Sequence, residues 1–117
     1  MSFDLGIWHR KGPFTKDEAA GIYQALCRGD RSVVDASPNV TAFFAELTAR
    51  YPDMNDYALE KIDDCPWNCS FDKSDGHVML NIAWSRVEEV MPFVSELIAK
   101  HKLIAYDPQE NQLYAAK

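Results

Sequence analysis

The sequence predicts an α+β domain in which three helices pack on one face of a four-stranded sheet that is mixed or mostly antiparallel. Three observations support this class. Apolar residues alternate with polar ones in short stretches, three other stretches have helical apolar spacing, and the length of 117 residues suits one hydrophobic core. The patterns follow in the order strand, helix, helix, strand, helix, strand, strand. No linker or repeat interrupts them, so residues 1–117 are expected to form a single domain.

The first two elements are a strand and a helix. Residues 2–9 alternate apolar and other side chains, which predicts a strand. Thr15 and Glu18 have the spacing of a capping box, in which the hydroxyl and the carboxylate each bond a backbone N–H of the first turn. A helix over about 16–28 should therefore follow, and Gly29 should end it.

A second helix is expected to begin at Ser37 and Pro38. Serine is a favoured N-cap, and proline fits the first helical position because its missing N–H costs nothing there. Tyr51 should end this helix, because Pro52 disfavours helical geometry in the residue before it. Residues 53–75 show no clear period.

The next strand and helix form the clearest pair of patterns. In residues 77–84 the large apolar side chains Val78, Leu80, Ile82 and Trp84 take every second position, which predicts a strand with one buried face. Ser85 and Glu88 suggest a second capping box, followed by an apolar stripe that runs to about residue 101. Pro92 falls within this stretch and should kink the helix, unless the helix begins near residue 91.

The C-terminal residues 103–116 are predicted to form a β-hairpin. An apolar stretch over 103–106 predicts a short strand, and the polar residues 107–111 predict a turn. Residues 112–116 can then return as an antiparallel partner.

Composition and charge exclude several classes of protein. An apolar content of 47% and a charged content of 26% are typical of a folded protein. The excess of 18 acidic over 12 basic residues gives a net charge of −6, which disfavours nucleic acid as a partner. No stretch is long and apolar enough for a membrane span, and the N-terminus does not resemble a secretory signal. We therefore expect a cytoplasmic protein whose three cysteines are reduced.

Acidic residues concentrate in the segment 53–75, which holds seven carboxylates against two lysines. Trp67 lies in the same segment, and a semi-exposed tryptophan among carboxylates is typical of a protein-binding hot spot. A carboxylate-rich surface would be attracted to a basic partner. The expected partner-binding residues are Asp56, Asp63, Asp64, Trp67, Asp72 and Asp75.

Metal and catalytic interpretations are weaker. Cys65, Cys69 and His77 offer zinc-type ligands, but their spacing is loose and no fourth ligand is marked. The acidic segment also fails as a calcium loop, because Ala58 occupies the position that requires glycine. No nucleophile elbow or phosphate-binding loop is present. We therefore expect no cofactor, no metal and no enzymatic activity.

One alternative is a small cytoplasmic enzyme or an anionic-ligand-binding domain with a pocket near Arg86. This residue should lie beside a helix N-terminus, where an anion could accept both guanidinium and backbone hydrogen bonds. The simpler interpretation is an ion pair between Arg86 and an acid such as Asp4, Asp107 or one in the acidic segment. A homodimer that forms through an exposed edge of the sheet is a further alternative.

Four segments carry a likeness to known proteins: Asp4-Leu5-Gly6-Ile7-Trp8, Cys65-Pro66-Trp67, Ile82-Ala83-Trp84-Ser85-Arg86-Val87-Glu88-Glu89-Val90 and Leu103-Ile104-Ala105-Tyr106-Asp107-Pro108-Gln109. They resemble a family of small, stand-alone bacterial proteins of unassigned activity. Small acidic α+β proteins of this type are similar to immunity proteins of polymorphic toxin systems, which bind and neutralise a cognate secreted toxin. The resemblance implies a toxin protein as the partner and brings no catalytic residues. That this partner has a basic face is expected from the acidic segment.

Overall fold

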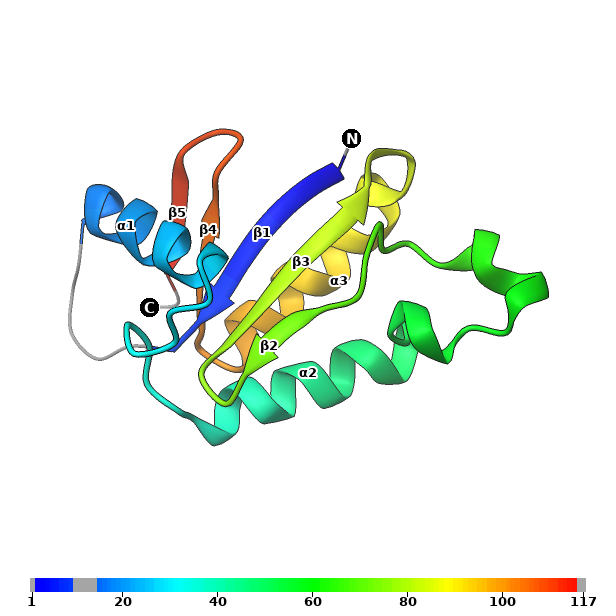
Figure 1. Ribbon diagram of the computed structural model, residues 1–117, viewed down its shortest axis with the longest axis horizontal. Coiled ribbons are helices and arrows are strands. Elements are labelled where there is room, and N and C mark those ends of the chain that lie inside the picture. The colour runs from blue at the N-terminus through cyan, green and yellow to red at the C-terminus, as the bar shows by residue number, and fades with distance from the viewer. Residues whose placement is uncertain (1, 10–14, 116–117) are drawn as a thin grey trace.

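The computed structural model describes residues 2–9 and 15–115, and it has an α+β fold (Figure 1). The predicted end of the last strand at residue 116 lies outside the described residues. None of the helices in the described part of the chain has the length and apolar character needed to cross a bilayer. The strands and α-helices are β1 (Ser2–Trp8), α1 (Lys16–Cys27), α2 (Pro38–Arg50), β2 (Asp72–Ser74), β3 (His77–Ala83), α3 (Val87–Lys100), β4 (Ile104–Asp107) and β5 (Gln112–Ala115).

The strands form one antiparallel sheet in the order β2-β3-β1-β4-β5. The central strand β1 pairs along its whole length with β3 on one side and over three residues with β4 on the other. Because β3 and β4 both run antiparallel to β1, they are parallel to each other but are not neighbours. The sheet has five strands rather than the predicted four, since β2 is only three residues long and shows no period in the sequence.

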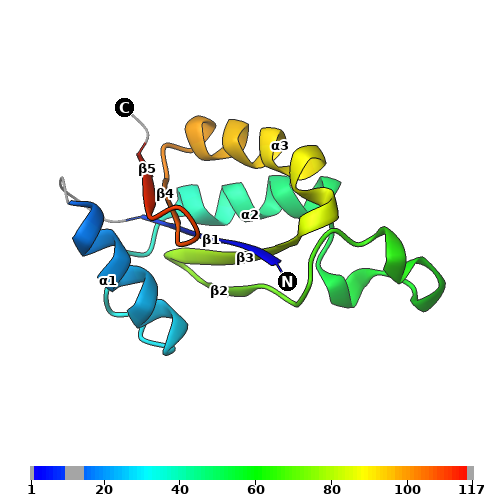
Figure 2. The same ribbon diagram turned by 90° about the horizontal axis from the view of Figure 1, so that it is seen from above.

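Helices cover both faces of the sheet, so the prediction of three helices on one face is wrong (Figure 2). Helices α2 and α3 pack on one face, over a core that includes Leu5, Ile7 and Leu80. Helix α1 packs on the opposite face, against Trp8 and Tyr106. Ile7 and Trp8 of β1 are consecutive buried residues, and so are Val78 and Met79 of β3. Because neighbouring residues of a strand point to opposite faces, each pair contributes one side chain to each core.

The helix starts were predicted correctly for α1 and α2. The Thr15 hydroxyl accepts from the Glu18 N–H at 3.1 Å, and the Glu18 carboxylate reaches back to the Thr15 N–H. Ser37 caps α2 through the Asn39 N–H at 3.1 Å. The capping box predicted at Ser85 is absent, because that residue lies inside a single 3₁₀ turn, η3 (Trp84–Arg86), which precedes α3.

Gly76 joins β2 to β3 at a point of close backbone contact, which makes it a test of the fold. A Cβ atom at this position would lie 2.6 Å from the carbonyl oxygen of Asp35. We expect Gly76→Ala to lower the free energy of unfolding by about 1–3 kcal/mol, because the opposing backbone must shift. Gly21 in α1 is the matched control, since a Cβ there meets nothing within 4 Å. Gly21→Ala should raise stability by about 0.5–1 kcal/mol in the same urea titration, and equal effects of the two variants would contradict this packing.

Candidate functional site

Residues 53–64 form a lobe that projects from one end of the sheet, at the right of Figure 1. We call these residues the acidic lobe. Two short 3₁₀ helices build it, η1 (Met54–Asp56) and η2 (Leu59–Asp64). The lobe carries five carboxylates and one ammonium, a net charge of −4 within the −6 of the whole chain. Its charged side chains are Asp53, Asp56, Glu60, Lys61, Asp63 and Asp64.

The surface of the acidic lobe combines free charge with exposed apolar area. Leu59 is 86% exposed and Ile62 is 36% exposed. The ion pairs found among the described residues take their acids from Asp72, Glu89 and Glu46, so none of them involves a lobe carboxylate. The lobe therefore presents carboxylates that belong to no ion pair among the described residues, together with exposed apolar side chains.

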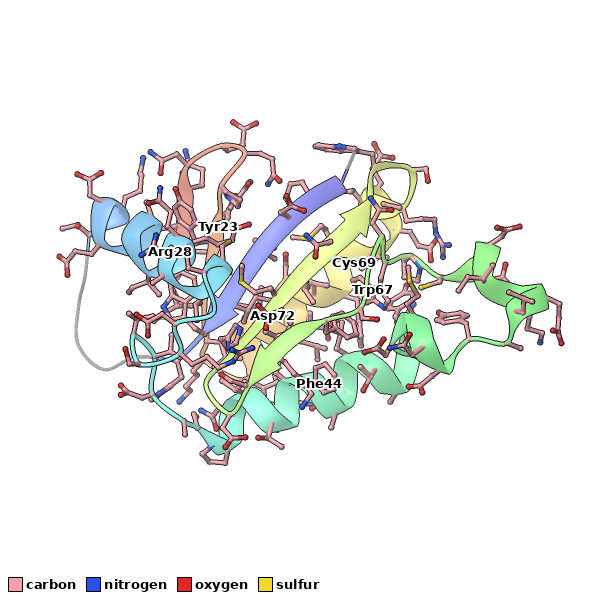
Figure 3. The ribbon with its side chains drawn as sticks, in the orientation of Figure 1. Tyr23, Arg28, Phe44, Trp67, Cys69 and Asp72 are labelled. Carbon is pink, nitrogen blue, oxygen red and sulfur yellow. The ribbon has the colours of Figure 1, made fainter. Side chains whose placement is uncertain are left out.

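Trp67 fixes the root of the acidic lobe from inside the protein. Its indole Nε1 donates to the carbonyl oxygens of Tyr51 at 3.2 Å and Pro52 at 3.0 Å, where the chain enters the lobe. Its backbone forms an isolated bridge with Ile82 of β3, where the chain leaves the lobe. The ring is only 2% exposed and packs 4.8 Å from the ring of Phe71. The expected semi-exposed hot spot is thus wrong, because these hydrogen bonds and ring contacts draw the side chain into the core (Figure 3).

Arg86 provides a second connection to the acidic lobe. Its guanidinium forms a two-pronged ion pair with Glu89, with N–O distances of 2.9 and 2.7 Å, and donates to the carbonyl oxygen of Asp64 at 2.9 Å. This hydrogen-bonded pair lowers the pKa of Glu89 and raises the pKa of Arg86. The guanidinium is therefore engaged within the chain, and its acidic partner is Glu89 rather than Asp4 or Asp107.

Asp72 and Asp75 lie apart from the acidic lobe. Asp72 belongs to β2 and Asp75 to the turn that follows it, and Figure 3 shows Asp72 away from the projecting lobe. Asp72 pairs with Arg31 at 2.6 Å. The six residues expected to bind a partner therefore do not form one patch: Asp56, Asp63 and Asp64 lie on the lobe, Trp67 lies beneath its root, and the remaining two lie elsewhere.

Asp72 takes part in a serine–histidine–aspartate arrangement. The Ser74 hydroxyl lies 2.5 Å from His77 Nδ1, and Asp72 lies 3.6 Å from His77 Nε2. A nucleophilic serine needs such a base, but it also needs access for a substrate. The His77 side chain is fully buried, and the Ser74 hydroxyl also accepts from the Gly76 N–H at 3.2 Å. These contacts tie the β2–β3 turn together and are structural.

Burial of His77 gives the fold a pH dependence. Burial lowers the pKa of His77 below its ordinary value of 6.5, against an opposing effect of Asp72 and with a further lowering by Arg31. The unfolded chain therefore binds a proton at His77 more readily than the folded chain does. Burying this side chain in its neutral form costs no extra free energy above about pH 7, and the folded state loses stability as the pH falls below 6.5. We expect urea unfolding to give a lower free energy at pH 5.5 than at pH 7.5, by at most about 1.4 kcal/mol per pH unit.

The control for this prediction is His77→Gln, which keeps a hydrogen-bonding side chain but has no titrating proton. The difference in stability between pH 7.5 and 5.5 should be smaller in this variant than in the wild type. An unchanged difference would show that other groups produce the pH dependence. The carboxylates of Glu46 and Glu89 do not interfere, because their pKa values are lowered from 4.5 and lie below this window.

The cysteines and His77 have separate surroundings. The buried Cys65 thiol lies 3.7 Å from the Trp67 carbonyl oxygen, and Cys69 donates to the Asn81 side-chain oxygen at 2.9 Å. Burial raises the pKa of both thiols, which keeps them protonated. Within residues 2–9 and 15–115, no three His, Cys, Asp or Glu side chains are grouped so that they could hold a metal ion.

The sequence did not lead us to expect exposed apolar side chains on the acidic lobe. Leu59 and Ile62 are three residues apart, with charged residues around them, which is the spacing of one face of a helical turn. Isolated apolar residues in an acidic stretch are easily assigned to the core, and here the core does not reach them. The sequence does carry a signal for the exposure of Leu59 and Ile62, because residues 58–64 contain too few apolar positions to pack a helix against the core.

Comparisons of this chain with known protein families, with curated proteins and with solved structures found no match.

Proposed function

We propose that this protein binds a basic partner protein through the acidic lobe and acts as an immunity protein, neutralising a cognate bacterial toxin. The observation that carries the proposal is the projecting lobe, in which Leu59 is 86% exposed within a net charge of −4. Exposed apolar area with a polar rim is typical of protein interaction sites. Unpaired carboxylates around it attract and orient a basic surface.

The rigid root of the lobe supports binding. Trp67 holds the entering chain, and Arg86 holds the backbone at Asp64. A docking element that is already ordered loses little conformational entropy when it binds, so more of the contact energy is retained as affinity. A toxin that acts on nucleic acid needs a basic cleft for its substrate, and an acidic projection of this kind could occupy that cleft.

Leu59 is expected to contribute to affinity without contributing to stability. Leu59→Ser should change the free energy of unfolding by less than about 0.5 kcal/mol, because the side chain is almost fully exposed. The same change should weaken partner binding about tenfold, a loss of about 1.4 kcal/mol. Calorimetric titration with the partner measures the affinity. Tyr114→Ser is the control, since it removes another exposed apolar side chain outside the lobe.

The proposal is tested by capture followed by a toxicity assay. The chain is used as bait in lysate of its source cell at low and high salt, and a single stoichiometric basic protein should be retained at low salt. That protein is then expressed in cells with and without this chain. Immunity predicts growth arrest that co-expression of this chain relieves. Capture of no basic protein, or of one whose expression leaves growth unaffected, would overturn the proposal.

A further inference from the structure

A hollow of about 280 Å³ opens between α3 and the strands β1, β4 and β5. It is lined by three strand residues and four residues from one side of α3. Its floor is part of the hydrophobic core, since Leu5 and Ala105 are each 1% exposed. The lining residues are Leu5, Met91, Ser95, Ile98, Ala99, Ala105 and Tyr114.

Small side chains on facing walls create this hollow. Ser95 and Ala99 are four residues apart on α3 and therefore share one face of the helix, opposite Ala105 of β4. Larger residues at these three positions would fill the space. Ser95 and Tyr114 are exposed, so the hollow is open to solvent above a buried apolar floor and a small molecule can enter it.

The chemistry of the lining is apolar with two hydroxyl groups. Leu5, Ile98 and the alanines form the apolar surface, and the hydroxyls come from Ser95 and Tyr114, both exposed residues. Among the residues that the structure describes, neither hydroxyl forms a hydrogen bond with another side chain or with the backbone. Both are therefore available to a polar group on a bound molecule.

We propose that this hollow binds a small apolar molecule, a ring or a short alkyl chain that carries one hydrogen-bonding group. A dry protein cavity of about 150 Å³ can hold benzene, so a hollow of this volume accommodates a substituted ring. The apolar part contacts Leu5 and Ile98, and the polar group bonds to Ser95 or Tyr114. The acidic lobe lies at the other end of the molecule from β5 (Figures 1 and 2), so this site is separate from the proposed partner surface and stands without it.

The experiment is an NMR titration of the full chain with p-cresol and with 1-hexanol as probes. Each probe has an apolar body and one hydroxyl. The methyl resonances of Met91, Ile98 and Ala105 should shift and saturate below the solubility limit of the probe. The methyl groups of Leu59 serve as an internal reference and should not move, because they lie on the acidic lobe.

Two variants fill the hollow from different walls. Ala105→Leu fills it from the floor and Ser95→Leu from the helix, and each should weaken probe binding by about tenfold or more. Ala42→Leu on the exposed side of α2 is the matched control and should bind like the wild type. Thermal melting checks that each variant is folded. If one of the two filled variants does not fold, the other still tests the proposal.

Three results would overturn the proposal. The first is an absence of saturating shifts with either probe. The second is unchanged probe binding in a folded filled variant. The third is a shift of the same methyl groups with protein concentration alone, which would assign the hollow to contact between two copies of the chain.

Discussion

Reversing the charges of Asp63 and Asp64 together, in the double variant D63K/D64K, is expected to slow association with a basic partner at least about tenfold at low salt. Both side chains are exposed, and neither belongs to an ion pair among the described residues. Their negative charge is therefore available for long-range attraction. The wild-type association rate should fall steeply as salt is added, because the Debye length shortens. The variant should show a flatter salt dependence in stopped-flow or surface-binding measurements.

The control must separate the position of the charge from the total charge. E96K/E110K changes the net charge by the same amount at two exposed acids outside the lobe. This control should retain most of the wild-type association rate. The stability of both double variants should lie within about 0.5 kcal/mol of the wild type, as is usual for surface substitutions. An equal loss of rate in the two variants would show that overall charge, rather than the lobe, attracts the partner.

Trp67→Ala is expected to lower the free energy of unfolding by about 3–5 kcal/mol, the range found for large aromatic residues in cores. The side chain is 2% exposed and contacts the rings of Tyr51 and Phe71 at centroid distances of 6.3 and 4.8 Å. Its loss leaves a cavity and removes the donor for two backbone carbonyls at the root of the lobe. Urea unfolding at pH 7.5 measures the change.

Trp67→Phe separates the two contributions. It keeps an aromatic ring but removes the indole N–H, so the cost should fall to about 1–3 kcal/mol, the penalty for leaving buried acceptors unsatisfied plus part of the packing. Hydrogen exchange of residues 53–64 should also accelerate in this variant, because the entering chain is no longer held. A fully stable Trp67→Ala protein would contradict the assignment of Trp67 to the core.

Local signals in the sequence were sufficient for most of the secondary structure. The alternation over residues 2–8, the capping box at Thr15 and the Ser37–Pro38 start each depend on contacts between residues close in the chain. Such contacts have a recognisable spacing, so the strand and both helix starts were predicted correctly. The α+β class followed from their order, which left open whether the sheet is mixed or antiparallel.

Features that depend on distant contacts were missed. The place of α1 on the second face depends on Trp8, Met79 and Tyr106, which come from three strands and meet only in the folded sheet. Strand β2 forms because three residues pair with β3, and three residues carry no detectable period. The predicted cap of α3 at Ser85 was missed because Ser85 lies inside the preceding 3₁₀ turn, and the helix begins at Val87.

The candidate site was predicted in its charge but not in its geometry. The sequence locates the carboxylates of 53–75 in one stretch, yet the chain runs from the projecting lobe back along the sheet, so the acidic lobe and β2 lie on different parts of the molecule (Figures 1 and 2). Trp67 was assigned by its acidic neighbours, whereas its environment is set by Tyr51, Phe71 and Ile82. Residues that are close in the sequence show where charged side chains are concentrated, but the fold determines which of them lie on the same surface.

The central claim is that the acidic lobe is the surface that meets the partner. Hydrogen exchange with mass spectrometry, measured on this chain alone and with the captured basic partner, tests it most directly. We predict that the partner slows hydrogen exchange in residues 53–64 and leaves exchange in the β2–β3 turn and α1 unchanged. Protection of the β2–β3 turn or of α1, with unchanged exchange in the lobe, would contradict it.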